Sequence, residues 1–149
     1  MNKMKKILIF IICCSLFIFP IPVHATENAP NTISLENGLT YIDKITVEPS
    51  ATRSSPSTHT LTRSFYDGET LIATIAFTAT FQYDGSSVSV ISKSVTQTDT
   101  YRGWSYKQES FTSSGGTVTL SGKLNYLLLF NSTSFTMSMT CDANGNISY

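Results

Sequence analysis

The stretch TLIATIAFTATFQY, residues 70–83, alternates apolar and polar side chains over almost its whole length. Alternation with a period of two places every second side chain on the same face of an extended strand. Thr74, Thr78, Thr80 and Gln82 would share the polar face. The apolar face would hold Leu71, Ala73, Ile75, Phe77, Ala79, Phe81 and Tyr83. The pattern therefore predicts a long strand with one buried face.

Turn-forming residues bound this stretch and recur along the chain. They are Asp67-Gly68, Asp84-Gly85, Ser113–Gly116, Asn131-Ser132 and Asp142–Gly145. Such residues favour the tight turns of antiparallel hairpins. The strand-like segments are 60–66, 70–83, 87–98, 103–112, 117–126, 133–141 and 146–149. We therefore predict an all-β fold, an antiparallel β-sandwich of about seven strands of the immunoglobulin-like kind.

Two of these segments carry more detailed expectations. In residues 87–98 the apolar phase changes at Ile91, which indicates a bulge or a strand that passes between two sheets. In residues 103–112, Trp104 and Tyr106 are expected on one face and Phe111 on the other.

The N-terminal 25 residues resemble a secretory signal peptide. A basic start at 1–6 precedes an apolar run at 7–19, and Val23-His24-Ala25 is a small-x-small step before a cleavage point. The run covers about 13 residues, whereas a bilayer span needs about 20. A retained anchor stays an alternative, but we expect cleavage after Ala25, an extracellular location and no stable membrane span in the mature protein.

Residues 26–57 are expected to be a flexible leader or linker, and residues 58–149 the sandwich domain. Pro30, Pro49 and Pro56 and several asparagines and serines favour turns over packed elements. The alternative is that part of this segment belongs to the fold, because LTYIDKITV at 39–47 has the composition of a short strand.

Loss of the signal peptide would change the chemistry available to the chain. Three of the ten Lys and Arg residues lie in it, so the mature chain is mildly acidic and has no basic stripe for nucleic acid. Cys141 and His59 would be its sole cysteine and histidine. No intrachain disulfide can then form.

Enzymatic and metal chemistry have little support in the sequence. Cys141 and His59 could form a thiol-imidazole pair, but Cys141 is in phase with the apolar residues of 133–141, which favours burial. No Gly-x-Ser-x-Gly segment presents a serine, and one histidine and one cysteine are too few for zinc. Most acids stand in turns: Asp67, Glu69, Asp84, Asp99, Glu109 and Asp142. We expect no catalytic residue, no cofactor and no metal.

The C-terminal TCDANGNISY, residues 140–149, has two interpretations. Oxygen-bearing residues at alternate positions suggest a calcium loop, but glycine comes fourth rather than sixth and the sequence stops before a twelfth position. Asn144-Gly145 is instead a preferred pair for a two-residue hairpin turn. We expect the turn, with Cys141 as a buried residue before it.

Several segments, taken in their order and spacing, carry a resemblance. They are SFYDGE at 64–69, ATFQYDGSSV at 79–88, the single Trp104, SGGTVTLSG at 114–122 and MTCDANGNIS at 139–148. Together they resemble a group of small secreted proteins from Gram-positive, Clostridia-like bacteria. The resemblance covers residues 58–149 and implies export and a β fold. No activity is established for that group, so it implies no site residue.

The candidate binding residues are Tyr101, Arg102, Trp104 and Tyr106, in TDTYRGWSY. Flat aromatic rings beside hydrogen-bonding side chains are what a sugar-binding surface uses. The alternative is that Trp104 and Tyr106 fill the core, as the single tryptophan of a sandwich commonly does. The apolar patch at 127–130 is either a buried crossing or an exposed contact for a partner or a membrane.

We therefore expect a secreted, non-catalytic binding or interaction module. Its partner would be an extracellular glycan or a protein, and nucleic acid is not expected. The alternatives are a carbohydrate- or cell-wall-binding module that uses the exposed aromatic residues, and a small antagonistic protein of the bacteriocin kind.

Overall fold

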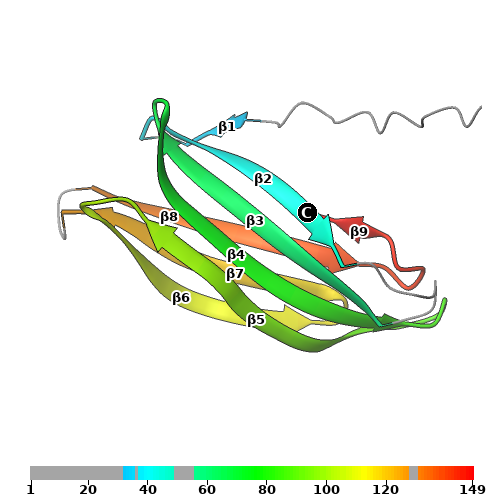
Figure 1. The fold of residues 1–149 in the computed structure, drawn as a ribbon. Coiled ribbons are helices and arrows are strands. Elements are labelled where there is room, and N and C mark those ends of the chain that lie inside the picture. The colour runs from blue at the N-terminus through cyan, green and yellow to red at the C-terminus, as the bar shows by residue number, and fades with distance from the viewer. Residues whose placement is uncertain (1–31, 36, 49–55, 128–130) are drawn as a thin grey trace, which may run out of the picture.

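The computed structural model describes residues 32–35, 37–48, 56–127 and 131–149, which form two layers of strands (Figure 1). One sheet contains β1 (Thr32–Ser34), β2 (Leu39–Val47), β3 (Ser57–Asp67), β4 (Thr70–Tyr83) and β5 (Val88–Thr100). The other contains β6 (Trp104–Ser114), β7 (Thr117–Tyr126), β8 (Asn131–Cys141) and β9 (Ile147–Ser148). The expected signal peptide and positions 128–130 of the apolar patch lie outside the described residues.

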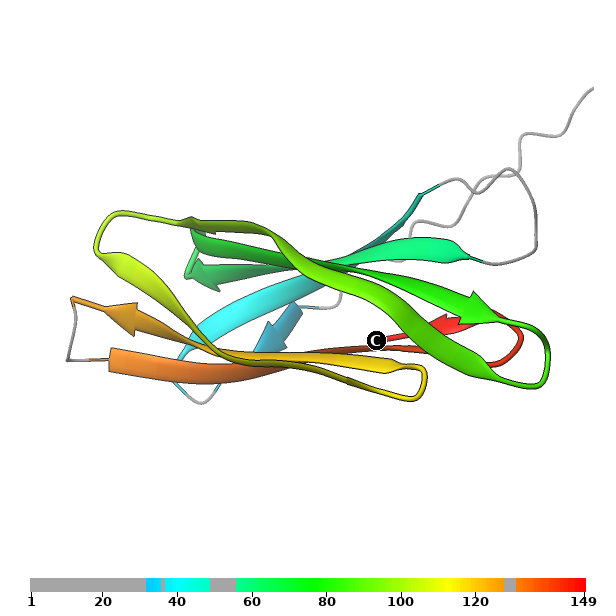
Figure 2. The same ribbon diagram turned by 90° about the horizontal axis from the view of Figure 1, so that it is seen from below.

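The predicted antiparallel β-sandwich is confirmed, and Figure 2 shows the two layers from below. Neighbouring strands in each sheet are consecutive in the chain and antiparallel, so each sheet is a meander. Immunoglobulin-like sandwiches instead have Greek-key connections. The immunoglobulin-like arrangement is therefore not confirmed. The chain passes from the first sheet to the second through residues 101–103, between β5 and β6.

The segment expected as a flexible leader contributes two strands to the first sheet. β2 pairs with β3 from Leu39, opposite Asp67, to Val47, opposite His59, and β1 pairs with β2. Leu39 is buried in the core, which explains why this segment packs despite its composition. Pro49 and Pro56 follow β2 and do not interrupt it. The strand that we kept as an alternative is therefore present, and the domain begins before residue 58.

The core lies between the sheets and is built mainly from β3, β4, β7 and β8 (Figure 2). Alternating side chains of these strands are almost fully buried, as their pattern predicts. Cys141 is among them, as expected, with 1% of its surface exposed. The largest fully buried side chains are Phe65, Phe77, Phe81, Leu61, Ile72, Ile75, Leu120, Leu124, Met137 and Met139.

The start of β4 differs from the simple alternation. Phe65 of β3 lies opposite Ala73 and Tyr66 lies opposite Leu71, so Ile72 is an extra residue between the two pairs. This bulge turns Ile72 into the core and leaves Leu71 46% exposed, although Leu71 was predicted on the buried face. Leu71 is therefore exposed at the end of the sandwich where β3 and β4 connect.

Bulges also explain two other departures from regular alternation. Ile91 is the extra residue between the pairs of Val90 and Ser92 with β4, which confirms a bulge at the predicted phase change. In β6, Glu109 is skipped in the pairing with β7. The prediction that Trp104 and Phe111 point to different faces of their strand was wrong. The bulge at Glu109 shifts the alternation by one residue, so both side chains pack against the core.

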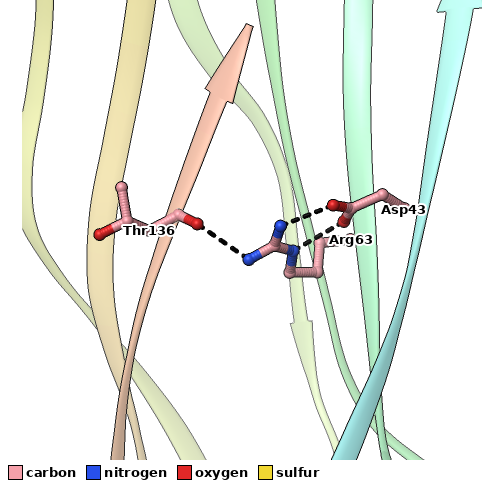
Figure 3. A network of polar contacts seen from close by, with 3 residues as sticks. All are labelled: Asp43, Arg63 and Thr136. Carbon is pink, nitrogen blue, oxygen red and sulfur yellow. Dashed lines mark hydrogen bonds and ion pairs between the residues drawn. The ribbon is translucent and has the colours of Figure 1, made fainter. Parts of the chain in front are cut away.

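Arg63 joins the two sheets through a buried polar network (Figure 3). Its Nε and Nη2 atoms donate to the Asp43 carboxylate of β2, each at 2.6 Å, and its Nη1 donates to the Thr136 carbonyl oxygen of β8 at 2.9 Å. The guanidinium carbon lies 3.8 Å from the centre of the Tyr41 ring. Three strands from two sheets are therefore held by one side chain.

The β8–β9 connection is a turn, as expected, but a wider one than a two-residue Asn-Gly hairpin. It spans residues 142–146, and Gly145 has a φ of +85°, whereas Asn144 is not among the residues with positive φ. The Asp142 carboxylate accepts hydrogen bonds from the backbone N–H groups of Asn144 and Asn146 at 2.8 and 2.9 Å. The oxygens considered for a calcium loop therefore close the turn itself.

Candidate binding cleft at one end of the sandwich

The β3–β4 and β5–β6 connections and the end of β7 lie at the same end of the sandwich (Figure 1). The residues at this end line a cleft of about 270 Å³. We call it the end cleft. Its lining residues come from both sheets and are Asp67, Thr70, Ile72, Tyr101, Arg102, Trp104 and Tyr126. Three of the four residues proposed from the sequence, Tyr101, Arg102 and Trp104, are therefore brought together here.

Backbone hydrogen bonds hold the β5–β6 connection in place. The Tyr101 N–H donates to the Ile72 carbonyl oxygen of β4 at 2.7 Å, and the Trp104 N–H donates to the Tyr101 carbonyl oxygen at 2.9 Å. The Leu127 N–H donates to the Gly103 carbonyl oxygen, also at 2.9 Å. The connection is thus attached to both sheets, and the side chains that it carries into the cleft have a fixed base.

Gly103 is needed at the centre of this connection for two reasons. Its φ is +87°, a conformation that side chains other than glycine rarely adopt. A Cβ atom at this position would also lie 3.0 Å from Cε2 of Tyr126. The glycine therefore lets the connection turn directly against an aromatic ring of the cleft.

The aromatic rings of the end cleft differ in exposure. Tyr101 is 58% exposed, whereas Trp104 is half-buried and also packs against the core. The Trp104 and Tyr126 ring centres are 5.1 Å apart with a tilt of 41°, an arrangement that aromatic pairs favour. The Trp104 ring therefore packs against the core and also lines the cleft, and a sugar-binding role for it stays a prediction.

Tyr106, the fourth proposed residue, lies elsewhere. Its ring faces Phe135 of β8 at 6.0 Å and occupies the space beside Gly122, where a Cβ atom would be 2.6 Å from its Cε2. Burial raises the pKa of its hydroxyl, and the oxygen has no hydrogen-bond partner among the described residues. Tyr106 packs against the core and does not line the end cleft.

Four residues of the end cleft were not proposed from the sequence: Asp67, Thr70, Ile72 and Tyr126. Asp67 was recognised only as a turn residue, and Tyr126 only as the last residue of the strand-like segment 117–126. Tyr126 pairs with Trp104 in the β6–β7 hairpin, and this pairing depends on the bulge at Glu109, which was not predicted from the sequence.

Other hollows also lie in the described part of the protein, and two of them bear on the candidate site. One, of about 200 Å³, adjoins the end cleft and shares Ile72 and Tyr101 with it; its other lining residues are Leu71, Ala73, Thr74, Asp99 and Thr100. We call it the side notch. The other, of about 350 Å³, is lined by Leu35, Asn37, Ser132, Thr133 and Ser134, none of which is aromatic or charged. The end cleft and side notch offer the more varied chemistry.

The groups considered for thiol catalysis are arranged for packing. Burial, and then the nearby Asp142 carboxylate, raises the pKa of the Cys141 thiol, which is the opposite of what a reactive thiolate requires. The Cys141 Sγ donates to the Asp142 carbonyl oxygen at 3.4 Å. His59 Nε2 lies 3.0 Å from the Ser57 hydroxyl oxygen, and the imidazole packs beside Phe81.

The acidic side chains at the opposite end are bound within their own turns. Hydrogen bonds from Ser86 and Ser87 lower the pKa of Asp84, and those from Asn146, with smaller contributions from Asn144 and Gly145, lower that of Asp142. Glu109 is not in a turn but in β6, and its carboxylate pairs with the Lys123 ammonium of β7 at 2.8 Å. Within the described ranges, no three His, Cys, Asp or Glu side chains gather in a group that could hold a metal ion.

Among the described residues, no helix is long and apolar enough to cross a membrane. No protein-family model, no curated protein and no solved structure matches the chain.

Proposed function

We propose that the mature chain is an exported, non-catalytic binding module that holds an extracellular glycan in the end cleft. The observation that carries this proposal is the gathering of three aromatic rings, those of Tyr101, Trp104 and Tyr126, with the charged groups of Arg102 and Asp67 in one cleft. Export is supported by the basic start and apolar run of the N-terminal 25 residues.

The chemistry of the cleft suits a sugar. Aromatic faces pack on the apolar C–H face of a pyranose ring, while sugar hydroxyls need donors and acceptors at its edge. Arg102 supplies donors, Asp67 supplies acceptors, and the Thr70 hydroxyl can do either. A ligand with one apolar face and polar edges therefore meets a matching group on each side.

The same cleft supports binding rather than hydrolysis. Enzymes that hydrolyse glycosides generally use two carboxyl groups about 5–10 Å apart. Of the described residues that line the end cleft, Asp67 is the one with a carboxylate. Asp99 lines the adjoining side notch and already interacts within the protein. Asp84 and Asp142 accept hydrogen bonds within turns at the other end. This arrangement favours a binding module.

A fluorescence titration tests the proposal, because Trp104 is the single tryptophan of the sequence. Soluble cell-wall and host-glycan fractions, added to the mature protein, should shift the emission of Trp104 in a saturable way. The Tyr101→Ala variant should bind about two- to tenfold more weakly, since one aromatic contact contributes about 0.5–1.5 kcal/mol.

The matched control is Tyr149→Ala, because Tyr149 is 61% exposed and follows β9, outside the end cleft. This variant should bind like the unchanged protein. Trp104 emission that no glycan fraction alters, or equal losses in both variants, would contradict the proposal.

A membrane-active, antagonistic function is the second candidate, because Leu71, Tyr101 and Leu127 expose about half of their surfaces at this same end. Exposed apolar groups of this kind can mark a membrane contact. Release of dye from phosphatidylcholine and phosphatidylglycerol vesicles by the mature protein would favour this candidate. Intact vesicles together with a glycan-dependent Trp104 shift would favour the binding module.

A further inference from the structure

The end cleft and the side notch meet at Tyr101. Both are lined by this residue and by Ile72, and its N–H is held by the Ile72 carbonyl oxygen at 2.7 Å. The Tyr101 side chain nevertheless keeps 58% of its surface exposed. The backbone of Tyr101 is thus held in place, and its exposed ring lies at the boundary that the two hollows share.

The sizes of the two hollows indicate how large a ligand they fit. The end cleft measures about 270 Å³ and the side notch about 200 Å³. Pockets that bury small molecules usually measure about 300–1,000 Å³. Neither hollow reaches this range alone, but the two together do. A ligand that occupies both would bury more surface than one confined to either.

The chemistry continues from one hollow to the other. The end cleft offers the Trp104 and Tyr126 rings, and the side notch offers the exposed apolar side chain of Leu71 beside the hydroxyls of Thr74 and Thr100. Apolar surface next to hydrogen-bonding groups is therefore repeated on both sides of Tyr101. A repeating ligand, in which each unit has an apolar face and polar edges, matches this repetition.

The charges of the two hollows bear on the charge of the ligand. In the end cleft, the charged residues are Asp67 and Arg102, one carboxylate and one guanidinium. A polyanionic chain would need an excess of positive charge for electrostatic complementarity, and this pair does not supply one. A neutral chain needs no such excess.

We propose that the end cleft and the side notch form one groove, which binds a neutral, linear oligosaccharide with one sugar unit on each side of Tyr101. This inference rests on the proposed function, because it specifies the glycan that the end cleft would hold. It adds that the ligand has at least two units and that Leu71 takes part in binding.

Calorimetric titration with a series of defined saccharides tests the groove. β-1,4-linked oligomers of glucose and of N-acetylglucosamine, from one to four units, would be added to the mature protein. Affinity in at least one series should rise about tenfold between one and two or three units and then level off, since additional contacts form until the groove is filled.

Two variants separate the two hollows. Leu71→Ser alters the side notch alone, so it should abolish the gain with chain length while leaving the affinity for one unit within about twofold. Ile91→Ser is the matched control, because Ile91 is 52% exposed on β5 and lines neither hollow, and it should retain the gain. Equal melting temperatures would show that both variants fold.

The outcomes distinguish the two-hollow groove from the simpler claim that the end cleft binds a glycan. If single sugars bind and longer chains bind no tighter, or if Leu71→Ser keeps the full gain, the two-hollow groove is wrong and the end cleft remains a glycan site. If neither these saccharides nor any glycan fraction shifts Trp104, the proposed function itself is wrong. Tight binding only to acidic saccharides would overturn the neutral-ligand inference.

Discussion

At the scale of single residues, burial of His59 disfavours its charged, protonated form. His59 lies on β3 with 5% of its surface exposed and packs beside the Phe81 ring. Its Nε2 lies 3.0 Å from the Ser57 hydroxyl oxygen, and its Nδ1 has no partner among the described residues. Burial lowers its pKa below the ordinary 6.5, because the charged imidazolium loses its hydration there.

This burial predicts a loss of stability in mild acid. The unfolded chain binds a proton at His59 near pH 6.5, whereas the folded chain binds it only at lower pH. The stability contributed by the neutral imidazole is therefore complete above pH 6.5 and declines as the pH falls towards the lowered pKa. Urea unfolding of the mature protein at about pH 7.5 and about pH 5 should show this decline.

His59→Gln is the matched variant for this test, because it keeps a polar side chain without a group that titrates in this range. It should be less dependent on pH over the same interval. The lowered pKa values of Asp84 and Asp142 place their titration in stronger acid, so they do not interfere. Equal pH dependence in the two proteins would show that His59 is not the group responsible.

At the scale of strands, Arg63 of β3 couples its neighbour β2 in the first sheet to β8 of the second sheet. Its buried charge is compensated because Asp43 pairs with two nitrogens of its guanidinium and the Thr136 carbonyl accepts a further N–H. The two side chains are 8% and 16% exposed. Such a pair is stable only while both partners are present, since a single buried charge is costly.

Removal of one partner should therefore destabilise the sandwich strongly. Arg63→Met leaves the Asp43 carboxylate without its buried counter-ion and should lower the free energy of unfolding by about 3–5 kcal/mol. The double variant Arg63→Met, Asp43→Leu removes both charges and should recover most of that loss. Urea unfolding measures both. A double variant no more stable than the single one would contradict this account.

Strand periodicity also marks the limit of what the sequence predicts. The alternation in β4 correctly predicted Ala73, Ile75 and Phe77 as core residues. Alternation failed at Leu71 of β4 and at Phe111 of β6. Bulges at Ile72 and Glu109 each insert one residue, so the side chains beyond the bulge point to the other face of the strand. A bulge depends on packing against neighbouring strands, so a single strand pattern does not locate it reliably.

At the scale of the whole molecule, two sequential meanders bring the β5–β6 connection beside the start of β4 and the end of β7, and the end cleft lies there. The composition of TDTYRGWSY was enough to propose Tyr101, Arg102 and Trp104. Tyr126 was not predictable from a regular hairpin, because without the Glu109 bulge the residue opposite Trp104 would be Leu127. Contributions from the other sheet, such as Asp67, depend on how the sheets pack.

The most direct test of the central claim, that the end cleft holds a glycan, is the nuclear magnetic resonance signal of the Trp104 indole N–H. The mature protein has one tryptophan, so this signal can be followed without ambiguity. On addition of a glycan fraction that binds, the signal should shift saturably, together with the amides of Tyr101 and Arg102, while the amides of the β8–β9 turn stay in place. Binding that shifts the β8–β9 turn and leaves the Trp104 indole unchanged would contradict the claim.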